Sequence, residues 1–272
     1  MHTNASDGTL SPSELVHQAR AAGLSIIGIT DHDTTAGSDA ARGAARIAGL
    51  EIVSGIEISA VTDGRDVHVL GYFIDTSCAS LRDFLDSQRQ ERRRRVRKMG
   101  DRLAALGYPV DVSSILEDAS AGRSVGRPQI AAAMVDAGYV ATRDEAFARF
   151  LEFGGPAFVA RRGAAPEAVV GIIHACGGLA SLAHPGVTKR DALIATLAAA
   201  GLDALEARHS DHDAATEAHY RAQAAAFNLL VTGGSDFHGD TGHRIPHLGS
   251  VTLPAEDFER LRIAATRGSA HR

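Results

Sequence analysis

The sequence predicts an α/β protein, a barrel of strands and crossover helices that is interrupted by a helical insertion. Short apolar segments alternate with helical segments near both ends of the chain, which is typical of a parallel sheet with crossover helices. Between Cys78 and about Phe158 the strand signals disappear and helical signals dominate. A length of 272 residues accommodates one barrel with an insertion or two ordinary domains.

The individual elements follow from local signals. Ser11-Pro12-Ser13-Glu14 combines a capping box with proline at the first helical position, so a helix is expected from Pro12 to about Ala22, before Gly23. The apolar run over residues 25–30 suits a buried parallel strand. Apolar runs predict further strands at Glu51–Ile56, Val67–Phe73, Leu179–Ala183, Asp203–Ala207 and Leu229–Thr232, and a candidate edge strand at Leu248–Leu253. Further helices are expected at Ser38–Ala48, Lys189–Ala200 and Ala214–Phe227.

The middle of the chain is predicted to be a helical cap on the barrel. Its helical candidates are Leu81–Leu106, Pro128–Ala137 and Arg143–Glu152. We expect residues 1–78 to form the first part of the barrel, residues 79–157 the insertion, and residues 158–272 the second part. Residues of one candidate site occur in both outer segments, so the middle segment is expected to interrupt a single barrel.

Composition excludes several classes of protein. There are 28 Lys and Arg against 33 Asp and Glu, a net charge of −5, and the chain is 44% hydrophobic and 22% charged. These values exclude a disordered, collagen-like or coiled-coil chain and disfavour a dedicated duplex nucleic-acid binder. No apolar run of about 18 residues and no signal-peptide pattern is present, so a cytoplasmic protein is expected. Two cysteines, Cys78 and Cys176, are too few for a disulfide framework.

Side chains that commonly bind metals recur after the apolar strands. They are His2, Asp7, His32, Glu57, His68, His184, Asp236 and His238. Carboxyl ends of parallel barrel strands converge on one face, so these side chains are expected to meet there. Five imidazoles and three carboxylates exceed the needs of one ion, and this mixture suits Zn, Mn or Fe rather than Ca or Mg alone.

Each of these residues also has a structural interpretation. A single histidine near a strand end more often packs or forms a hydrogen bond, and Asp7 fits a turn. Asp31 and Asp33 could cap the following helix. Taken together, however, so many polar side chains at strand ends would each need a separate hydrogen-bond partner to offset the cost of burial. The set as a whole therefore favours a metal site.

Five motifs carry a resemblance to a known family. They are T-D-H-D-T-T, V-S-G-I-E-I-S, V-H-V-L-G-Y, A-H-P-G and G-G-S-D-F-H-G. With these motifs the chain resembles the PHP (polymerase and histidinol phosphatase) family, and within it the bacterial 3′,5′-nucleoside bisphosphate phosphatases. The stretches G-R-P-Q-I-A at 126–131 and G-G-P-A-F-V at 154–159 are similar to that subgroup's helical insertion. The resemblance implies a distorted seven-stranded β/α barrel around three metal ions.

The resemblance also implies how the ligands divide. One metal would be held by His2, Glu57 and Asp236; a second by Glu57, His68 and His184; and a third by Asp7, His32 and His238. The expected cofactors are therefore two or three divalent ions, Mn, Fe or Zn.

Two positions depart from the family pattern. The family motif opens with two histidines one residue apart, preceded by a strand, and here Met1 stands between them, so the first histidine would precede the chain. Six strands are visible where the family has seven, and the expected explanation is a truncated first strand or a start upstream of Met1. In addition, Gln129 stands where the subgroup often has histidine. Its amide can donate a hydrogen bond to phosphate but supplies no proton at neutral pH.

The expected chemistry is phosphoester hydrolysis. Clustered metals lower the pKa of bound water toward about 7 and bind phosphate oxygens. With the resemblance, this predicts removal of the 3′-phosphate from nucleoside 3′,5′-bisphosphates by attack of a metal-bridging hydroxide. The alternatives are a 5′→3′ exonuclease on short RNA and a catalytically impaired metal- or nucleotide-binding module. The expected partner is a small phosphorylated nucleotide or short RNA, not duplex DNA or a membrane.

Substrate contacts are expected mainly from the insertion. Arg127 is the leading phosphate clamp, because a guanidinium binds phosphate bidentately. Gln129 and Arg161 are further candidates, with Arg162 weaker. His212 matches a subgroup histidine and is the candidate proton donor to the leaving group.

Other basic side chains are given less weight. The run over residues 92–98 could guide the phosphates of an oligonucleotide, but a solvated helix face paired with acids is the favoured interpretation. His209, His219, His243 and His247 are expected to face solvent.

Overall fold

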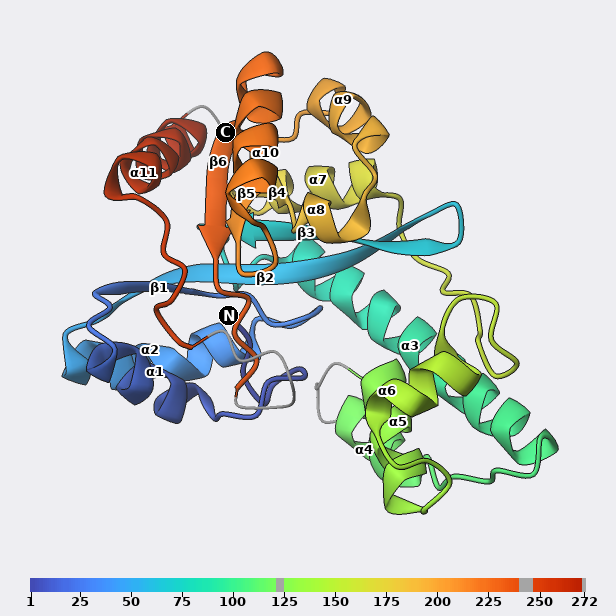
Figure 1. Cartoon of the computed structure of the whole chain (residues 1–272). Coiled ribbons are helices and arrows are strands. Elements are labelled where there is room, and N and C mark those ends of the chain that lie inside the picture. Colours follow the sequence, from blue (N-terminus) through green and yellow to red (C-terminus); the bar gives the residue numbers. More distant parts are fainter. Residues whose placement is uncertain (121–124, 240–246, 271–272) are drawn as a thin grey trace.

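A curled, mixed sheet forms the centre of the molecule (Figure 1). The computed structural model describes residues 1–120, 125–239 and 247–270. In these residues the strands follow one another in the order β1-β2-β3-β4-β5-β6. Their bounds are β1 Ile26–Ile29, β2 Glu51–Thr62, β3 Arg65–Tyr72, β4 Leu179–Leu182, β5 Ala204–His209 and β6 Leu230–Gly234. The predicted α/β class and all six visible strands are thus confirmed.

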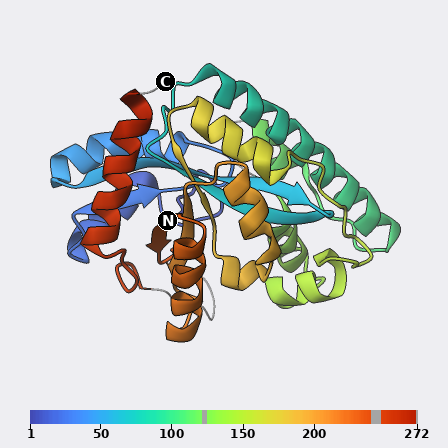
Figure 2. The same cartoon turned by 90° about the horizontal axis from the view of Figure 1, so that it is seen from above.

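The helices pack either against this sheet or mainly against one another. Their bounds are α1 Pro12–Ala21, α2 Ala36–Ala48, α3 Ala79–Ala105, α4 Ser113–Ser120, α5 Arg127–Asp136, α6 Arg143–Ala146, the π-helical η1 Phe147–Leu151, α7 Pro166–Ala175, α8 Pro185–Thr188, α9 Ala192–Ala199, α10 Ala214–Ala226 and α11 Ala255–Ala270. Seen from above, the long α3 runs beside α7, and α7 packs on β2, β3 and β4 (Figure 2). The predicted capping box of α1 is present, with Ser11 and Glu14 bonding to each other's backbone N–H.

The sheet is mixed rather than parallel, which corrects the sequence-based expectation. β2 pairs with β3, and β3 with β4, in antiparallel fashion. The cause is a two-residue turn at Asp63-Gly64, where both residues have positive φ, as the commonest tight hairpin turns require. β3 therefore runs against its neighbours, and its histidine lies in mid-strand rather than at a carboxyl end. The candidate strand at Leu248–Leu253 was also wrong, because this segment is irregular and leads into α11.

The helical segment has a core of its own. Buried side chains of α3, α5 and η1 pack together, with Met99, Ile130 and Leu151 completely buried among them. In Figure 1 this group lies beside the sheet and joins it through the first half of α3. The predicted insertion boundaries at residues 79 and 157 fall outside all six strands, and the division into segments remains a prediction.

A gap separates the two edge strands of the sheet. The carbonyl of Met1 accepts a hydrogen bond from the N–H of Thr30 at 2.9 Å, so the first residue continues the ladder of β1. On the other side, the N–H of His2 donates to the carbonyl of Phe237 at 2.9 Å, just beyond β6. A cavity of about 400 Å³ is lined by Met1, by the edge strands β1 and β6, and by apolar side chains such as Leu253. The seventh strand of the expected barrel remains a prediction.

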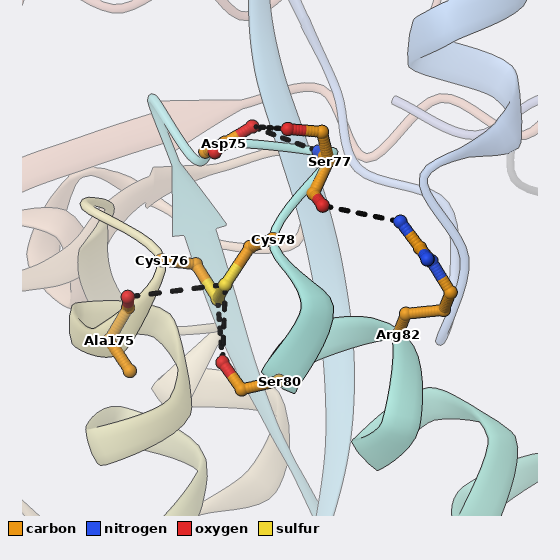
Figure 3. Close-up of a disulfide and its surroundings, with 7 residues drawn as sticks. All are labelled: Asp75, Ser77, Cys78, Ser80, Arg82, Ala175 and Cys176. Carbon is orange, nitrogen blue, oxygen red and sulfur yellow. Dashed lines mark hydrogen bonds between the residues drawn. A yellow bond between two sulfur atoms is a disulfide. The ribbon is translucent and has the colours of Figure 1, made fainter.

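A disulfide links the start of α3 to the end of α7 (Figure 3). Cys78, immediately before α3, is bonded to Cys176, immediately after α7, and their Cα atoms are 5.6 Å apart. The hydroxyl of Ser80 lies 3.2 Å from the Cys78 sulfur. Two cysteines were expected to be too few for a disulfide framework, but the fold brings these two together across a separation of 98 positions and they form a bond. None of the helices in the described ranges has both the length and the apolar character needed to cross a membrane.

Candidate metal centre

All eight predicted ligands converge at one end of the sheet. Their side chains come from six places: the N-terminal segment, the end of β1, strand β2, strand β3, the end of β4, and the loop after β6. His2 and Glu57 are buried, and the others are partly accessible. The convergence across the barrel is what the sequence pattern predicted, although His68 reaches the site from within β3.

Glu57 lies at the middle of the cluster. Its Oε1 is 2.6 Å from Nδ1 of His68 and 3.3 Å from Nε2 of His184. Its Oε2 is 3.1 Å from Nε2 of His2, which is itself 3.2 Å from Oδ1 of Asp236. The two oxygens of one carboxylate therefore face two different groups of ligands, as a bridging carboxylate would.

Asp7 lies at the middle of a third group. Its Oδ1 is 3.4 Å from Nε2 of His238 and 3.5 Å from Nδ1 of His2, and its Oδ2 is 3.8 Å from Nε2 of His32. Donor atoms within 4.8 Å of one another form three groups, which are His2, Asp7, His32 and His238; His32, Glu57 and His68; and His2, Glu57 and Asp236. The last group equals the first ligand set implied by the family resemblance, and His32 is shared between the other two.

The donor atoms fit divalent cations. Both ring nitrogens of His2, Nδ1 of His32 and Nδ1 of His184 are buried without a hydrogen-bond partner in the structure. Burial of an unpaired polar atom is costly, and four such atoms in one cluster indicate partners other than protein groups. Imidazole and carboxylate donors together match the preferences of Mn, Fe and Zn.

The charges of the cluster also suit cation binding. Burial alone raises the pKa of Glu57 and of Asp236, but the surrounding histidines outweigh it and hold both values well below the usual range. Burial lowers the pKa of His32 to about 4, so its ring is neutral at physiological pH, whereas the carboxylates around His2 and His184 outweigh burial and raise the pKa of both rings, that of His184 to about 9. A bound cation would have to displace the proton from these two rings. Ionised carboxylates and neutral imidazoles are the protonation states that bind metal ions.

Two aspartates hold the ligand segments in place. Asp31 accepts hydrogen bonds from the backbone N–H of Thr3 at 2.7 Å and from the hydroxyl of Ser6 at 2.7 Å, which fixes the segment that carries His2 and Asp7. The helix-capping alternative for Asp31 and Asp33 was wrong. α2 begins at Ala36 after Thr35, and no side chain caps it.

Asp33 instead joins the helical segment to the barrel. It is completely buried and accepts hydrogen bonds from the backbone of Ser59, from Arg161 at 3.1 Å and from Nε of Arg92 at 2.7 Å. Although burial raises the pKa of Asp33, the two guanidinium groups lower it far more. Arg92 lies in the basic run of α3, so this part of the run is an internal contact rather than a solvated face.

A cleft rich in arginine adjoins the metal ligands. A cavity of about 120 Å³ lies between His32 and His68 on one side and the helical segment on the other. Its lining includes Arg92, Arg95, Arg127 and Arg161 together with Gln129. Arg127 and Gln129 are thus placed beside the cluster, whereas Arg97, Lys98 and Arg162 are exposed.

Two predicted substrate residues also have structural contacts. The Oε1 atom of Gln129 accepts a hydrogen bond from the N–H of Gly126 at 2.8 Å and so caps α5. The ring of His212 lies between two backbone groups, with Nδ1 2.8 Å from the carbonyl of Ala207 and Nε2 accepting from the N–H of Gly186 at 3.2 Å. With both nitrogens engaged, His212 connects the loop after β5 to the start of α8.

Comparison with known proteins now places this geometry in a family. A sequence profile of the PHP domain matches residues 1–132. The chain is 36% identical over 249 residues to a 5′-3′ exoribonuclease of Haemophilus influenzae, covering 89% of each protein. The chain belongs to the PHP family.

Other PHP relatives carry different activities. A phosphoribosyl 1,2-cyclic phosphate 1,2-diphosphodiesterase of Eggerthella lenta is 34% identical, over 92% of this chain and 96% of the relative. A 3′,5′-nucleoside bisphosphate phosphatase of Chromobacterium violaceum is 32% identical, over 90% and 89%. A solved structure from Bifidobacterium adolescentis, of a proposed metal-dependent phosphoesterase, superposes with a TM-score of 0.86 at 33% identity, covering 96% of this chain and 93% of that one.

One buried histidine beside this PHP site was missed. His209 was expected to face solvent, but it is 4% exposed and its Nε2 lies 3.6 Å from Oδ2 of Asp236. It stands at the end of β5, and the strand-end pattern applied to the other histidines would have found it. His219 and His247 are exposed as expected, and His243 lies outside the described residues.

Proposed function

We propose that this protein is a metal-dependent phosphoesterase that removes the 3′-phosphate from nucleoside 3′,5′-bisphosphates. The observation that carries the proposal is Glu57, whose two oxygens face separate histidine groups directly beside a cleft lined by arginines. The named activities of the PHP relatives, all on phosphate esters, support the reaction class. In this proposal His2, Asp7, His32, Glu57, His68, His184, Asp236 and His238 hold two or three divalent ions.

The residues of the chain divide the work between chemistry and binding. Bound divalent ions would supply an activated water and neutralise charge on the phosphate that is cleaved. Arg127, whose side chain is 26% exposed and lines the cleft, binds the remaining phosphate of the nucleotide. The amide N–H₂ of Gln129 can donate to the same phosphate while its oxygen caps α5.

His212 is the candidate donor of the leaving-group proton. His212 would have to give up its contact with Gly186 or Ala207 before Nε2 or Nδ1 could serve the leaving oxygen. Burial lowers the pKa of His212, which disfavours the protonated ring that a proton donor needs. A His212→Ala enzyme with unchanged turnover and KM would remove this residue from the reaction.

A panel of substrates tests the activity. Adenosine 3′,5′-bisphosphate, AMP, short 5′-phosphorylated RNA, a cyclic phosphodiester and histidinol phosphate are incubated with Mn²⁺, and released phosphate and nucleotides are quantified. The proposal predicts fastest release from the bisphosphate. Release from none of them would overturn the enzyme assignment and favour a binding module, whereas metal content near three ions per chain supports the enzyme.

The second candidate is a 5′→3′ exoribonuclease on short RNA. It is favoured by the Haemophilus influenzae relative and by the arginine residues of α3 that line the cleft, Arg92 and Arg95. Sequential release of mononucleotides from 5′-phosphorylated RNA, faster than phosphate release from the bisphosphate, would establish it. Either activity makes a small phosphorylated nucleotide or short RNA the partner, and a cytoplasmic location remains a prediction.

We also propose that a seventh strand fits between β1 and β6. The hydrogen bond of Met1 to Thr30 and the apolar cavity between the edge strands support this closure. A chain extended before Met1 by five β-branched residues should gain thermal stability, because the added strand would pair with both β1 and β6. An equally long Gly-Ser extension is the control, and equal melting temperatures for the two extended chains would contradict the proposal.

A further inference from the structure

Asp66 stands between the candidate metal ligands and the arginine-lined cleft. It lies in β3 two residues before His68, and alternate residues of a strand point to the same face, so both side chains point into the site. Its Oδ2 is 3.1 Å from Nη2 of Arg127 and 3.9 Å from Nη1 of Arg95. Asp66 thus occupies the part of the guanidinium surface that an anion would use.

The two carboxylates near these arginines have different surroundings. Asp33 is completely buried, and its oxygens are held by Ser59, Arg92 and Arg161. The side chain of Asp66 is 21% exposed, and its buried Oδ1 atom has no hydrogen-bond partner. Asp33 is therefore a fixed structural counter-charge, whereas Asp66 pairs with Arg127 and Arg95 through its Oδ2 atom in the described part of the chain.

Arg127 depends on Asp66 for its charge balance. Among the described residues, Asp66 is the acidic group within ion-pair distance of Arg127. The other neighbours of this guanidinium are the rings of Phe147 and Phe158, whose centroids are 5.8 and 5.9 Å away. An incoming phosphate must share Arg127 with a carboxylate of the same sign of charge as its own.

Building on the proposed function, we propose that Asp66 is a specificity-determining residue that limits how tightly the arginine cleft holds phosphate groups. Its negative charge opposes that of a bound phosphate and competes for Arg127. The opposition scales with ligand charge, so a dianionic phosphomonoester is weakened more than a monoanionic phosphodiester. The carboxylate thereby prevents the cleft from being occupied permanently by phosphate or by a nucleoside monophosphate.

Equilibrium binding to the Asp66→Asn variant tests this inference. The probes are inorganic phosphate and AMP as dianions at pH 8, and dimethyl phosphate as the monoanion. Loss of a charge close to the bound anion should tighten binding of the dianions about tenfold or more at low salt, and that of dimethyl phosphate by a smaller factor. The gain should shrink as salt is added, because screening weakens the interaction.

Three comparisons keep the test decisive. Asp63→Asn, in the turn of the same hairpin with a 77% exposed side chain paired to Arg190, should leave binding unchanged. In an Arg127→Gln background, Asp66→Asn should have a much smaller effect, since the competing partner is gone. A thermal melt confirms that each variant is folded.

Weaker phosphate binding by folded Asp66→Asn would overturn the inference, because it would mean that Asp66 holds Arg127 in position for the anion. Unchanged binding would also overturn it, because the carboxylate would then not oppose the anion. The measurement needs no turnover. If the variant binds phosphate more tightly while the protein hydrolyses none of the proposed substrates, the inference stands and the proposed function fails.

Discussion

The Oε2 atom of Glu57 lies 3.1 Å from Nε2 of His2, while its Oε1 atom lies 2.6 Å from Nδ1 of His68. His2 is at the start of the chain, and β2 and β3 form a hairpin much farther along it. One carboxylate thus contacts candidate ligands from segments that are far apart in the chain. Loss of this single side chain should affect more than one metal position.

We therefore expect Glu57→Gln to bind fewer metal ions and to lose activity at least about a hundredfold, because an amide is a poorer ligand and does not bridge two cations. Metal content measured by mass spectrometry and phosphate release together check this. Glu51→Gln, at the exposed start of the same strand and paired with Arg262, is the matched control. Full metal content in the Glu57→Gln variant would contradict the bridging role.

Asp33→Ala should destabilise the protein by about 3–5 kcal/mol, since it leaves Arg92 and Arg161 buried without their carboxylate. Urea unfolding at pH 7 measures the change. The comparison is Asp86→Ala, which removes an exposed carboxylate that pairs with Arg89 on α3 and should cost at most about 1 kcal/mol. Equal losses of unfolding free energy in the two variants would show that the buried ion pairs of Asp33 stabilise the fold no more than an exposed one.

The contribution of Asp33 should also depend on pH. Its pKa is lowered in the folded state, so its stabilisation is complete above the unfolded value near 3.9 and is lost as pH falls below it. The difference in unfolding free energy between wild type and Asp33→Asn should therefore be largest near pH 7 and smaller by about 1 kcal/mol at pH 3. A difference that is constant over this range would be inconsistent with a depressed pKa.

Reduction of the Cys78–Cys176 disulfide should lower stability by up to about 4–5 kcal/mol, the value expected for a closed loop of roughly a hundred residues. Thermal unfolding with and without reductant measures this, and peptide mapping confirms the bridge. The Cys78→Ser, Cys176→Ser double variant should have the melting temperature of the reduced protein, and added reductant should leave that temperature unchanged. If reductant shifts the double variant as much as the wild type, the bridge is not the cause.

Local patterns in the sequence were sufficient for the order of the six strands, whereas four helices, α4, α7, α8 and α11, were not predicted. The capping box at Ser11, the apolar runs of the strands and the helical segment after Cys78 are set by residues close together in the chain, and the structure reproduces them. The direction of β3 was missed because it depends on the tight turn at Asp63-Gly64, a signal that was present in the sequence but not used.

Six of the candidate ligands were identifiable because each follows or lies within an apolar strand, and strands of one sheet bring such positions together. His2 and Asp7 lie before β1, and the family resemblance supported their assignment. The division of the ligands into groups required coordinates, since His32 lies near both Asp7 and Glu57. The contacts of Asp33 and Asp66 with arginines could not be predicted, because they join segments far apart in the chain. His209 was missed although it stands at a strand end, where the pattern used for the other histidines applies.

The sequence by itself thus determined the α/β class, the run of helices between β3 and β4 and the candidate metal ligands that lie close together in the fold, all of which depend on short-range periodicity and residue chemistry. Tertiary structure alone decided the mixed direction of the sheet, the disulfide between Cys78 and Cys176, and the counter-charges of the arginine cleft. These features depend on long-range packing, which sets the distances between side chains that no local pattern relates.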